Sequence, residues 1–283
     1  IFGYLLTTDT RQQKIPLIPG PKRAGKGVIG RVLRGLLGPA NVCNPTLASL
    51  QSNFGLSSLL GKQVAIITDA RLGRADQHVI AERLLSISGE DGLDIDRKYR
   101  EPLTGVRLFT RFIILTNELP KVADASGALA SRFIVIPLTE SFYGREDHGL
   151  TDRLLTELPQ ILNWSIAGWK RLQERGRFVQ PSAGEEAIRE IEDLSSPISA
   201  FLRERTADAA GFSVTPEEIY KVWGEWCEAH GRDHKGTLQG FCRDIRAARP
   251  NLKTTQPREG KTRKRVYQGI RLLSAWELTE GQE

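Results

Sequence analysis

Residues 15–38 read IPLIPGPKRAGKGVIGRVLRGLLG. A short apolar run comes first and predicts a buried strand, a glycine-containing loop follows it, and the remainder carries apolar residues at helical spacing. The loop, from Gly20 to Lys26, matches the phosphate-binding pattern G-x-x-x-x-G-K. Because the pattern lies between a predicted strand and a predicted helix, it predicts a nucleotide site in an α/β fold with a parallel central sheet. The alternative is an ordinary glycine-rich turn.

The predicted site uses the backbone of this loop and the start of the helix after it. Loop N–H groups can point at a triphosphate, the helix N-terminus adds its positive dipole end, and the lysine reaches the outer phosphates. We therefore expect ATP and Mg²⁺ as cofactors. One position departs from the pattern, because Gly27 stands where a Ser or Thr would ligate the magnesium. The predicted nucleotide-binding residues are Gly20, Pro21, Lys22, Arg23, Ala24, Gly25, Lys26, Gly27 and Val28.

Composition limits the class of protein. The 283 residues suffice for two domains, and 40 Lys and Arg against 34 Asp and Glu give a formal net charge of +6, which favours a polyanionic partner. No apolar run approaches the roughly 20 residues of a membrane span, so we expect a soluble, cytoplasmic protein with no membrane partner. Three scattered cysteines do not indicate a disulfide framework. The chain opens inside an apolar segment without methionine, so we expect it to lack its natural start.

Two further apolar runs end in polar residues of a kind that serves ATP hydrolysis. The first ends at Asp69 and the second at Asn117, and ligands bind at the carboxyl ends of parallel strands. The acid can hold magnesium, directly or through water, or activate the attacking water, and the Asn can orient that water. Arg132 follows at a position from which a ring-forming ATPase could insert an arginine finger into its neighbour's site. The predicted catalytic residues are Lys26, Asp69, Asn117 and Arg132.

Each of these assignments has a simpler structural alternative. Asp69 can cap the helix that follows it, Asn117 can be a turn residue before Glu-Leu-Pro, and Arg132 can form a salt bridge within its own subunit.

The pattern changes near residue 197. Residues 1–175 are predicted as an ATPase domain of the AAA+ type, residues 176–196 as a linker helix, and residues 197–283 as a winged-helix domain, because three helices precede two short strands joined by a basic tip. This tip can also be a solvated loop. Four tryptophans at helical spacing, Trp164, Trp169, Trp223 and Trp226, are expected in the core. The predicted DNA-binding residues of this domain are Arg243, Arg246, Arg258, Lys261, Arg263, Lys264 and Arg265.

Four motifs in order resemble those of superfamily 3 helicases, specifically the primase-helicases of phages, plasmids and phage satellites. They are GPKRAGKG for Walker A, VAIITDA for Walker B, SISGEDGLDIDRKYRE for the B-prime region, and FIILTNELP with ALASRFIVIPL for motif C and the finger. Thr68 stands where many relatives carry a second acid. The resemblance covers about residues 1 to 175.

The resemblance implies an AAA+ helicase that forms a hexameric ring, translocates on single-stranded DNA and opens forked DNA, often with an upstream primase domain that this chain lacks. Within the B-prime region, IDRKYRE is similar to the pore hairpin of papillomavirus replicative helicases, which maps DNA contact onto Lys98 and Tyr99. An ordinary solvated hairpin is the alternative for these two residues.

Three functions compete. The first is an ATP-driven DNA helicase or translocase for replication of a phage, plasmid or integrated mobile element. The second is a replication initiator that binds nucleotide with little hydrolysis, which Gly27 favours. The third is a small-molecule P-loop kinase, which no predicted acceptor site or lid supports.

Overall fold

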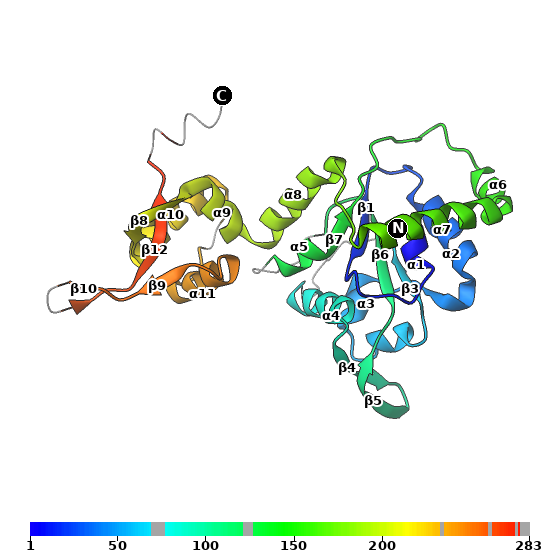
Figure 1. Cartoon of the computed structure of the whole chain (residues 1–283), viewed down its shortest axis with the longest axis horizontal. Helices are drawn as coiled ribbons and strands as arrows, with labels where there is room; N and C mark the ends of the chain where they lie inside the picture. The colour runs from blue at the N-terminus through cyan, green and yellow to red at the C-terminus, as the bar shows by residue number, and fades with distance from the viewer. Residues whose placement is uncertain (69–76, 121–126, 233–234, 260–261, 275–276, 278–283) are drawn as a thin grey trace. The chain divides into compact units, whose positions relative to one another are not determined.

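The computed structural model describes the whole chain except residues 69–76, 121–126, 233–234, 260–261, 275–276 and 278–283, and the side chains of residues 258, 259, 262 and 263. The chain forms two compact units (Figure 1). The first takes in residues 1–123 and 128–191, and the second takes in residues 192–283. The boundary between them falls inside the helix α8 (Glu185–Ser195).

A parallel sheet of five strands, in the order β2-β3-β6-β1-β7, lies at the centre of the first unit. Strand β1 is paired on both sides, with Pro19 opposite Thr116 of β6 and Ile15 opposite Phe133 of β7. Parallel neighbours require crossover connections, which the helices supply. The strands are β1 (Ile15–Pro19), β2 (Val42–Cys43), β3 (Val64–Ile67), β6 (Arg111–Thr116) and β7 (Phe133–Val135).

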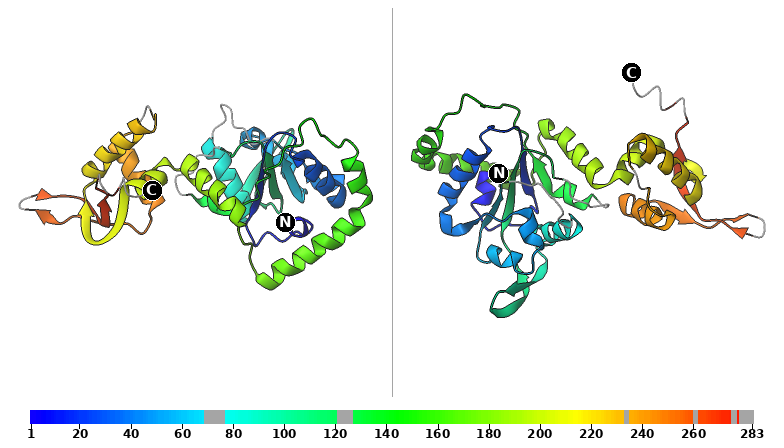
Figure 2. Two further views of the ribbon diagram at one scale, coloured as in Figure 1. Left: turned by 90° about the horizontal axis from the view of Figure 1, so that it is seen from above. Right: turned by 180° about the vertical axis from the view of Figure 1, so that it is seen from behind.

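Both faces of this sheet are buried, as the continuous apolar runs of the sequence predict. Alternate side chains point to opposite faces, so Ile66 and Ile113 pack toward α1, α2 and α7, whereas Ala65 and Ile114 pack toward α3, α4 and α5 (Figure 2). Three short 3₁₀ helices, Pro39–Asn41, Gly55–Leu59 and Ser182–Gly184, complete the connections within the described chain. The other helices are α1 (Phe2–Leu5), α2 (Lys26–Leu37), α3 (Leu47–Gln51), α4 (Gln77–Gly89), α5 (Ala128–Arg132), α6 (Leu150–Thr156) and α7 (Leu158–Arg175).

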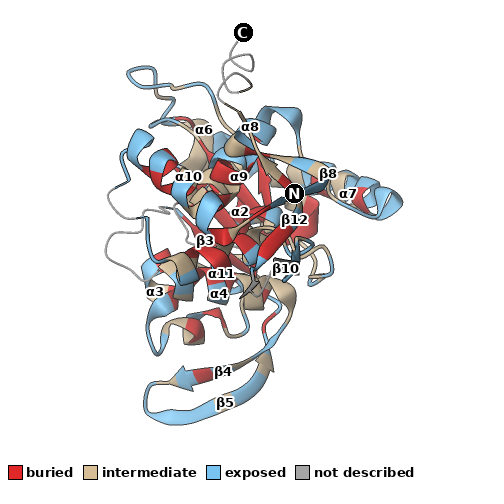
Figure 3. Cartoon of the chain, turned by 90° about the vertical axis from the view of Figure 1, so that its left-hand side faces the viewer, coloured by how far each residue is buried: buried red, intermediate tan, exposed pale blue. Residues whose placement is uncertain are grey.

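An antiparallel hairpin of β4 (Gly92–Arg97) and β5 (Arg100–Arg107) projects from this unit. Figure 3 shows that most of the hairpin is exposed. The hairpin is nonetheless attached to the unit, because Ile95 in β4 is 1% exposed and belongs to the hydrophobic core.

The second unit packs helices against a three-stranded antiparallel sheet of order β8-β12-β9. Its core is rich in aromatic rings, which include Phe201, Trp223 and Phe241. The sequence does not indicate β8, because TADAAGFSV is short of strand-forming residues, and pairing with β12 imposes the extended form. The elements are α9 (Pro197–Arg205), β8 (Thr206–Val214), α10 (Pro216–Ala229), α11 (Leu238–Ala248), β9 (Lys253–Thr255), β10 (Arg258–Glu259), β11 (Thr262–Arg263) and β12 (Val266–Leu272).

The expectation that all four tryptophans are buried is wrong for one of them. Trp223 and Trp226 are buried and Trp169 is partly buried against the core, but Trp164 is 61% exposed. Helical spacing alone does not identify the buried face of α7, because that face depends on where α1 and α2 pack. None of the described helices is long and apolar enough to cross a membrane.

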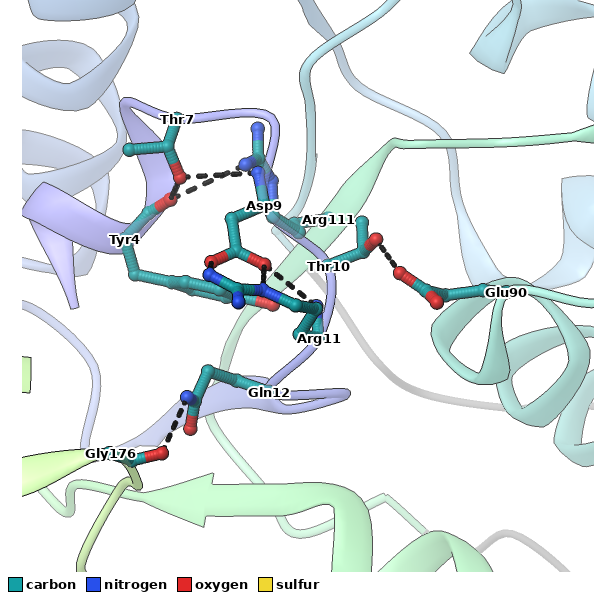
Figure 4. Close-up of polar contacts among 9 residues, drawn as sticks. All are labelled: Tyr4, Thr7, Asp9, Thr10, Arg11, Gln12, Glu90, Arg111 and Gly176. Carbon is teal, nitrogen blue, oxygen red and sulfur yellow. Dashed lines mark hydrogen bonds and ion pairs between the residues drawn. The ribbon is translucent and has the colours of Figure 1, made fainter. Parts of the chain in front are cut away.

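A buried arginine at the start of β6 holds the first helix against the sheet. The Arg111 guanidinium donates to the carbonyls of Tyr4 (3.3 Å), Leu5 (3.4 Å) and Gln63 (3.1 Å), and lies over the Tyr4 ring at 5.7 Å (Figure 4). The first two carbonyls belong to the C-terminal end of α1, where the helix dipole favours a cation. Burial lowers the pKa of Arg111 to about 10, so the side chain remains charged at neutral pH.

We expect Arg111→Ala to lower the free energy of unfolding by about 2–4 kcal/mol, because it removes charge-assisted hydrogen bonds and leaves a cavity. Arg11→Ala is the matched control, since Arg11 forms an exposed ion pair with Asp9 (2.8 Å, Figure 4) whose loss should change stability by less than about 1 kcal/mol. Urea denaturation followed by circular dichroism measures both. Equal effects of the two substitutions would contradict the role of Arg111.

Candidate nucleotide site

The predicted phosphate loop forms a tight turn from β1 into α2. The Gly20 amide donates to the Thr116 carbonyl at the end of β6 (3.1 Å), so the loop begins against the neighbouring strand. Gly25 has a φ of 85° and precedes the first residue of α2. That left-handed conformation disfavours residues with a Cβ, which explains the second glycine of the motif. The loop therefore ends at a helix N-terminus, as anion binding requires.

The Lys26 side chain turns back over this loop. Its ammonium donates to the carbonyls of Gly20 (2.8 Å) and Pro21 (2.6 Å). Partial burial lowers the pKa of Lys26. The ammonium is thus held at the mouth of the loop, where a phosphate oxygen can replace a carbonyl as its acceptor.

A cavity of about 560 Å³ opens beside the loop. Its lining comes from the loop residues 23–28, from Arg31 of α2, and from a segment between Phe142 and Thr151. One wall of the cavity is therefore formed by a segment that lies more than a hundred residues after the phosphate-binding motif.

Hydrogen bonds tie that distant wall to the loop. The Ser141 hydroxyl donates to the Lys22 carbonyl (2.8 Å), and the Phe142 amide donates to the Arg23 carbonyl (3.2 Å). Arg23 also pairs with Glu146 (3.3 Å). These contacts enclose a nucleotide-sized space on the side away from the sheet.

Asn117 lies where the sequence predicts, at the carboxyl end of β6 and directly after Thr116. Since Thr116 pairs with Pro19, the strand end adjoins the start of the phosphate loop. Strand β3 ends at the same edge, with Ile67 opposite Ile114. Asp69, the predicted acid and magnesium ligand, lies outside the described residues.

Arg132 lies at the opposite edge of the sheet. It precedes Phe133, which pairs with the first residue of β1, whereas the phosphate loop follows the last residue. A strand of five residues separates the two edges by about 15 Å. The Arg132 guanidinium contacts the side-chain oxygen of Gln13 and no carboxylate among the described residues. Arg132 is therefore not placed to reach the phosphate loop of its own chain.

Gly27 has no hydroxyl to hold a magnesium ion, and the described part of the chain contains no group of three His, Cys, Asp or Glu side chains able to hold a metal. The described carboxylates that line the cavity, Glu146 and Asp147, pair with Arg23 and Arg153. The predicted ligand, Asp69, lies outside the described residues.

The predicted DNA-binding residues lie in two places. Lys98 and Tyr99 form the two-residue turn of the β4–β5 hairpin, since Arg97 pairs with Arg100. Arg243 and Arg246 lie on α11 of the second unit. The tip residues lie around β10 and β11, and Lys264 and Arg265 are exposed while the side chains of Arg258, Lys261 and Arg263 are outside the described set.

Sequence reasoning missed the 141–151 wall and Arg31. The wall carries no motif, so its approach to the loop has no local signal. Arg31 had one available signal, because it follows Gly27 by four residues and so shares its helix face.

Comparison with known proteins agrees with this architecture. A family model described as a family of unknown function (DUF5906) matches residues 18–132. No curated protein matches the chain. Two structures of the NrS-1 C-terminal region cover 95% of this chain and 70% of their own, at 15% and 16% identity with TM-scores of 0.53 and 0.55. A JCV helicase covers 64% of this chain and 51% of its own at 18% identity, with a TM-score of only 0.40.

The fold is α/β, with a parallel central sheet and a glycine-containing loop of the phosphate-binding pattern between β1 and α2. The likeness to the NrS-1 region extends over nearly the whole chain and concerns the fold alone.

Proposed function

We propose that the chain is an ATP-dependent DNA helicase or translocase that serves replication of a phage, plasmid or integrated mobile element. One observation carries the proposal: the unit that holds the phosphate loop also projects a hairpin whose exposed turn is Lys98-Tyr99. A motor on single-stranded DNA needs a nucleotide site and a DNA-contacting element with basic and aromatic side chains on the same compact unit.

Different residues of the chain have different roles in the proposed hydrolysis of ATP. Loop amides and Lys26 bind the phosphates, and Asn117 orients the attacking water from the adjoining strand end. Asp69 activates that water or holds Mg²⁺ through water. Magnesium supplies charge neutralisation at the transferred phosphoryl group.

The hairpin turn has features of a contact surface. The Tyr99 side chain is 93% exposed, and the residue has a φ of 58°, which is uncommon for a bulky residue. Lys98 lies over its ring, with the ammonium 5.1 Å from the ring centroid. An exposed ring can stack on a base or sugar while a lysine contacts phosphate.

The hairpin is mechanically joined to the nucleotide edge. Its second strand ends at Arg107, and β6, which ends beside the phosphate loop, begins at Arg111. Two of the three connecting residues are buried: Leu108 is 4% exposed, and the Thr110 hydroxyl lies within hydrogen-bond distance of the carbonyls of Leu59 (3.0 Å) and Lys62 (2.7 Å). Phe109 between them is 42% exposed. A shift of β6 on hydrolysis would therefore move the hairpin.

The second unit is proposed as a winged-helix domain that binds duplex or forked DNA. Its element order supports this, and α11 would be the helix that enters the groove. The proposed contacts to phosphates are Arg243, Arg246, Arg258, Lys261, Arg263, Lys264 and Arg265.

The proposed assembly is a homo-hexameric ring, and the distance of Arg132 from its own phosphate loop supports action between subunits. Since Arg132 cannot reach its own phosphate loop, it would act on the site of a neighbouring subunit. We also propose a primase domain upstream as a partner of the ring.

A replication initiator that binds ATP with little hydrolysis is the second candidate, favoured by Gly27. ATPase turnover with and without single-stranded DNA tests both functions. Turnover stimulated by DNA supports the motor, whereas tight binding without turnover supports the initiator.

Lys26→Ala should abolish ATP binding or turnover, because this ammonium is the side-chain charge at the mouth of the loop. A phosphate-release assay and calorimetry measure the two properties. Undiminished hydrolysis by the variant would refute the assignment of the site.

Lys98→Ala and Tyr99→Ala should keep basal ATPase and oligomeric state but lose stimulation by DNA and strand separation, since a stacking contact contributes roughly 1–3 kcal/mol. Trp164→Ala is the control, because Trp164 is also an exposed aromatic, at 61%, and lies on α7, outside the hairpin and the nucleotide cavity. If both hairpin variants unwound forked DNA at the normal rate, the proposed mechanical role of the hairpin would be contradicted.

Arg132→Ala should lower turnover by about 10³-fold or more if it acts as an arginine finger. Mixing Arg132→Ala with Lys26→Ala subunits should restore some activity, because certain interfaces then combine an intact loop with an intact finger. Verified mixed rings without recovered activity would argue against action between subunits.

A further inference from the structure

Arg31 lies close to the place that a side chain at position 27 would take. It lies one helical turn after Gly27, and its Nη1 would be 3.3 Å from a Cβ placed on that glycine. Such a contact is tighter than ordinary van der Waals distance. A side chain at position 27 therefore requires the Arg31 guanidinium to shift by a few tenths of an ångström.

The guanidinium is held by a neutral partner only. Its Nε and Nη2 both donate to the Thr151 hydroxyl, at 3.2 and 3.1 Å. No carboxylate lies within ion-pair distance of it among the described residues. An arginine held by one hydroxyl retains donors for a further acceptor.

The acidic side chains of the cavity are already engaged. Glu146 pairs with Arg23, and Asp147 pairs with Arg153. Arg31 lines the same cavity as Lys26. Arg145 lines it too, and donates to the Ser141 carbonyl (3.3 Å). Three cations with no carboxylate partner among the described residues thus face the space beside the phosphate loop, which favours a polyanion.

We infer that Arg31 binds the β- or γ-phosphate of the nucleotide from the side on which a hydroxyl at position 27 would hold magnesium. Nucleotide binding then depends on Arg31 and does not require Mg²⁺. Hydrolysis of the bound nucleotide can still require Mg²⁺. Guanidinium groups suit this task, since they bind phosphate oxygens through two parallel hydrogen bonds. The inference rests on the proposed nucleotide site.

The first experiment measures the Kd of ATP by calorimetry in Mg²⁺ and in EDTA. We expect the unsubstituted chain to bind with similar affinity in both buffers. Arg31→Ala should weaken binding in EDTA by at least about tenfold, the effect of losing a hydrogen bond to a charged group. Arg34→Ala is the matched control, because Arg34 is exposed on the same helix, outside the cavity, and bonds to Asn44. Thermal denaturation checks that each variant is folded.

The second experiment restores the hydroxyl. Gly27→Ser should push the guanidinium aside, weaken binding in EDTA, and make binding depend on Mg²⁺. Arg31→Lys should be intermediate, because it keeps the charge and loses the planar fork.

The outcomes separate this inference from the proposed function. If ATP binding requires Lys26 but is lost in EDTA, the role of Arg31 is wrong and the nucleotide site stands. The same holds if the Arg31→Ala and Arg34→Ala variants bind ATP with equal Kd. No binding of ATP in either buffer would overturn both.

Discussion

The pairing of β1 between β6 and β7 is the constraint on which the rest of the first unit depends. Because the three strands are parallel, their carboxyl ends meet at one edge and bring Gly20 beside Thr116. The same register puts Arg132 at the other edge, beside the first residue of β1. One sheet therefore separates the phosphate loop at one edge from Arg132 at the other.

The hairpin and the phosphate loop illustrate how burial can join distant surfaces. The Lys98-Tyr99 turn is exposed, yet the hairpin is anchored through Ile95 of β4 in the core and through buried Leu108 and Thr110 before β6. A packed interior transmits displacement because it has few voids to absorb it. The proposed coupling between ATP hydrolysis and movement of DNA requires a rigid connection between the phosphate loop and the hairpin. It does not require that the two lie close together.

Much of the architecture was predictable from local patterns. The continuous apolar runs at Val64–Ile67 and Arg111–Thr116 are buried strands, and the glycines around Lys26 form a turn into a helix. Strand β8 and the exposure of Trp164 were not predictable. The first is imposed by a partner strand with little local propensity, and the second depends on which face of α7 meets its neighbours.

The sequence by itself determined the strand, loop and helix of the phosphate site, because spacing of 2.0 or 3.6 residues and the demand for glycine act over a few residues. Only the tertiary structure decided what encloses that site. Ser141 and Thr151 meet Lys22 and Arg31 across about 120 residues of chain. Such contacts depend on the packing of α6 and the segment before it against α2 and the phosphate loop, and no short-range pattern in the sequence encodes them.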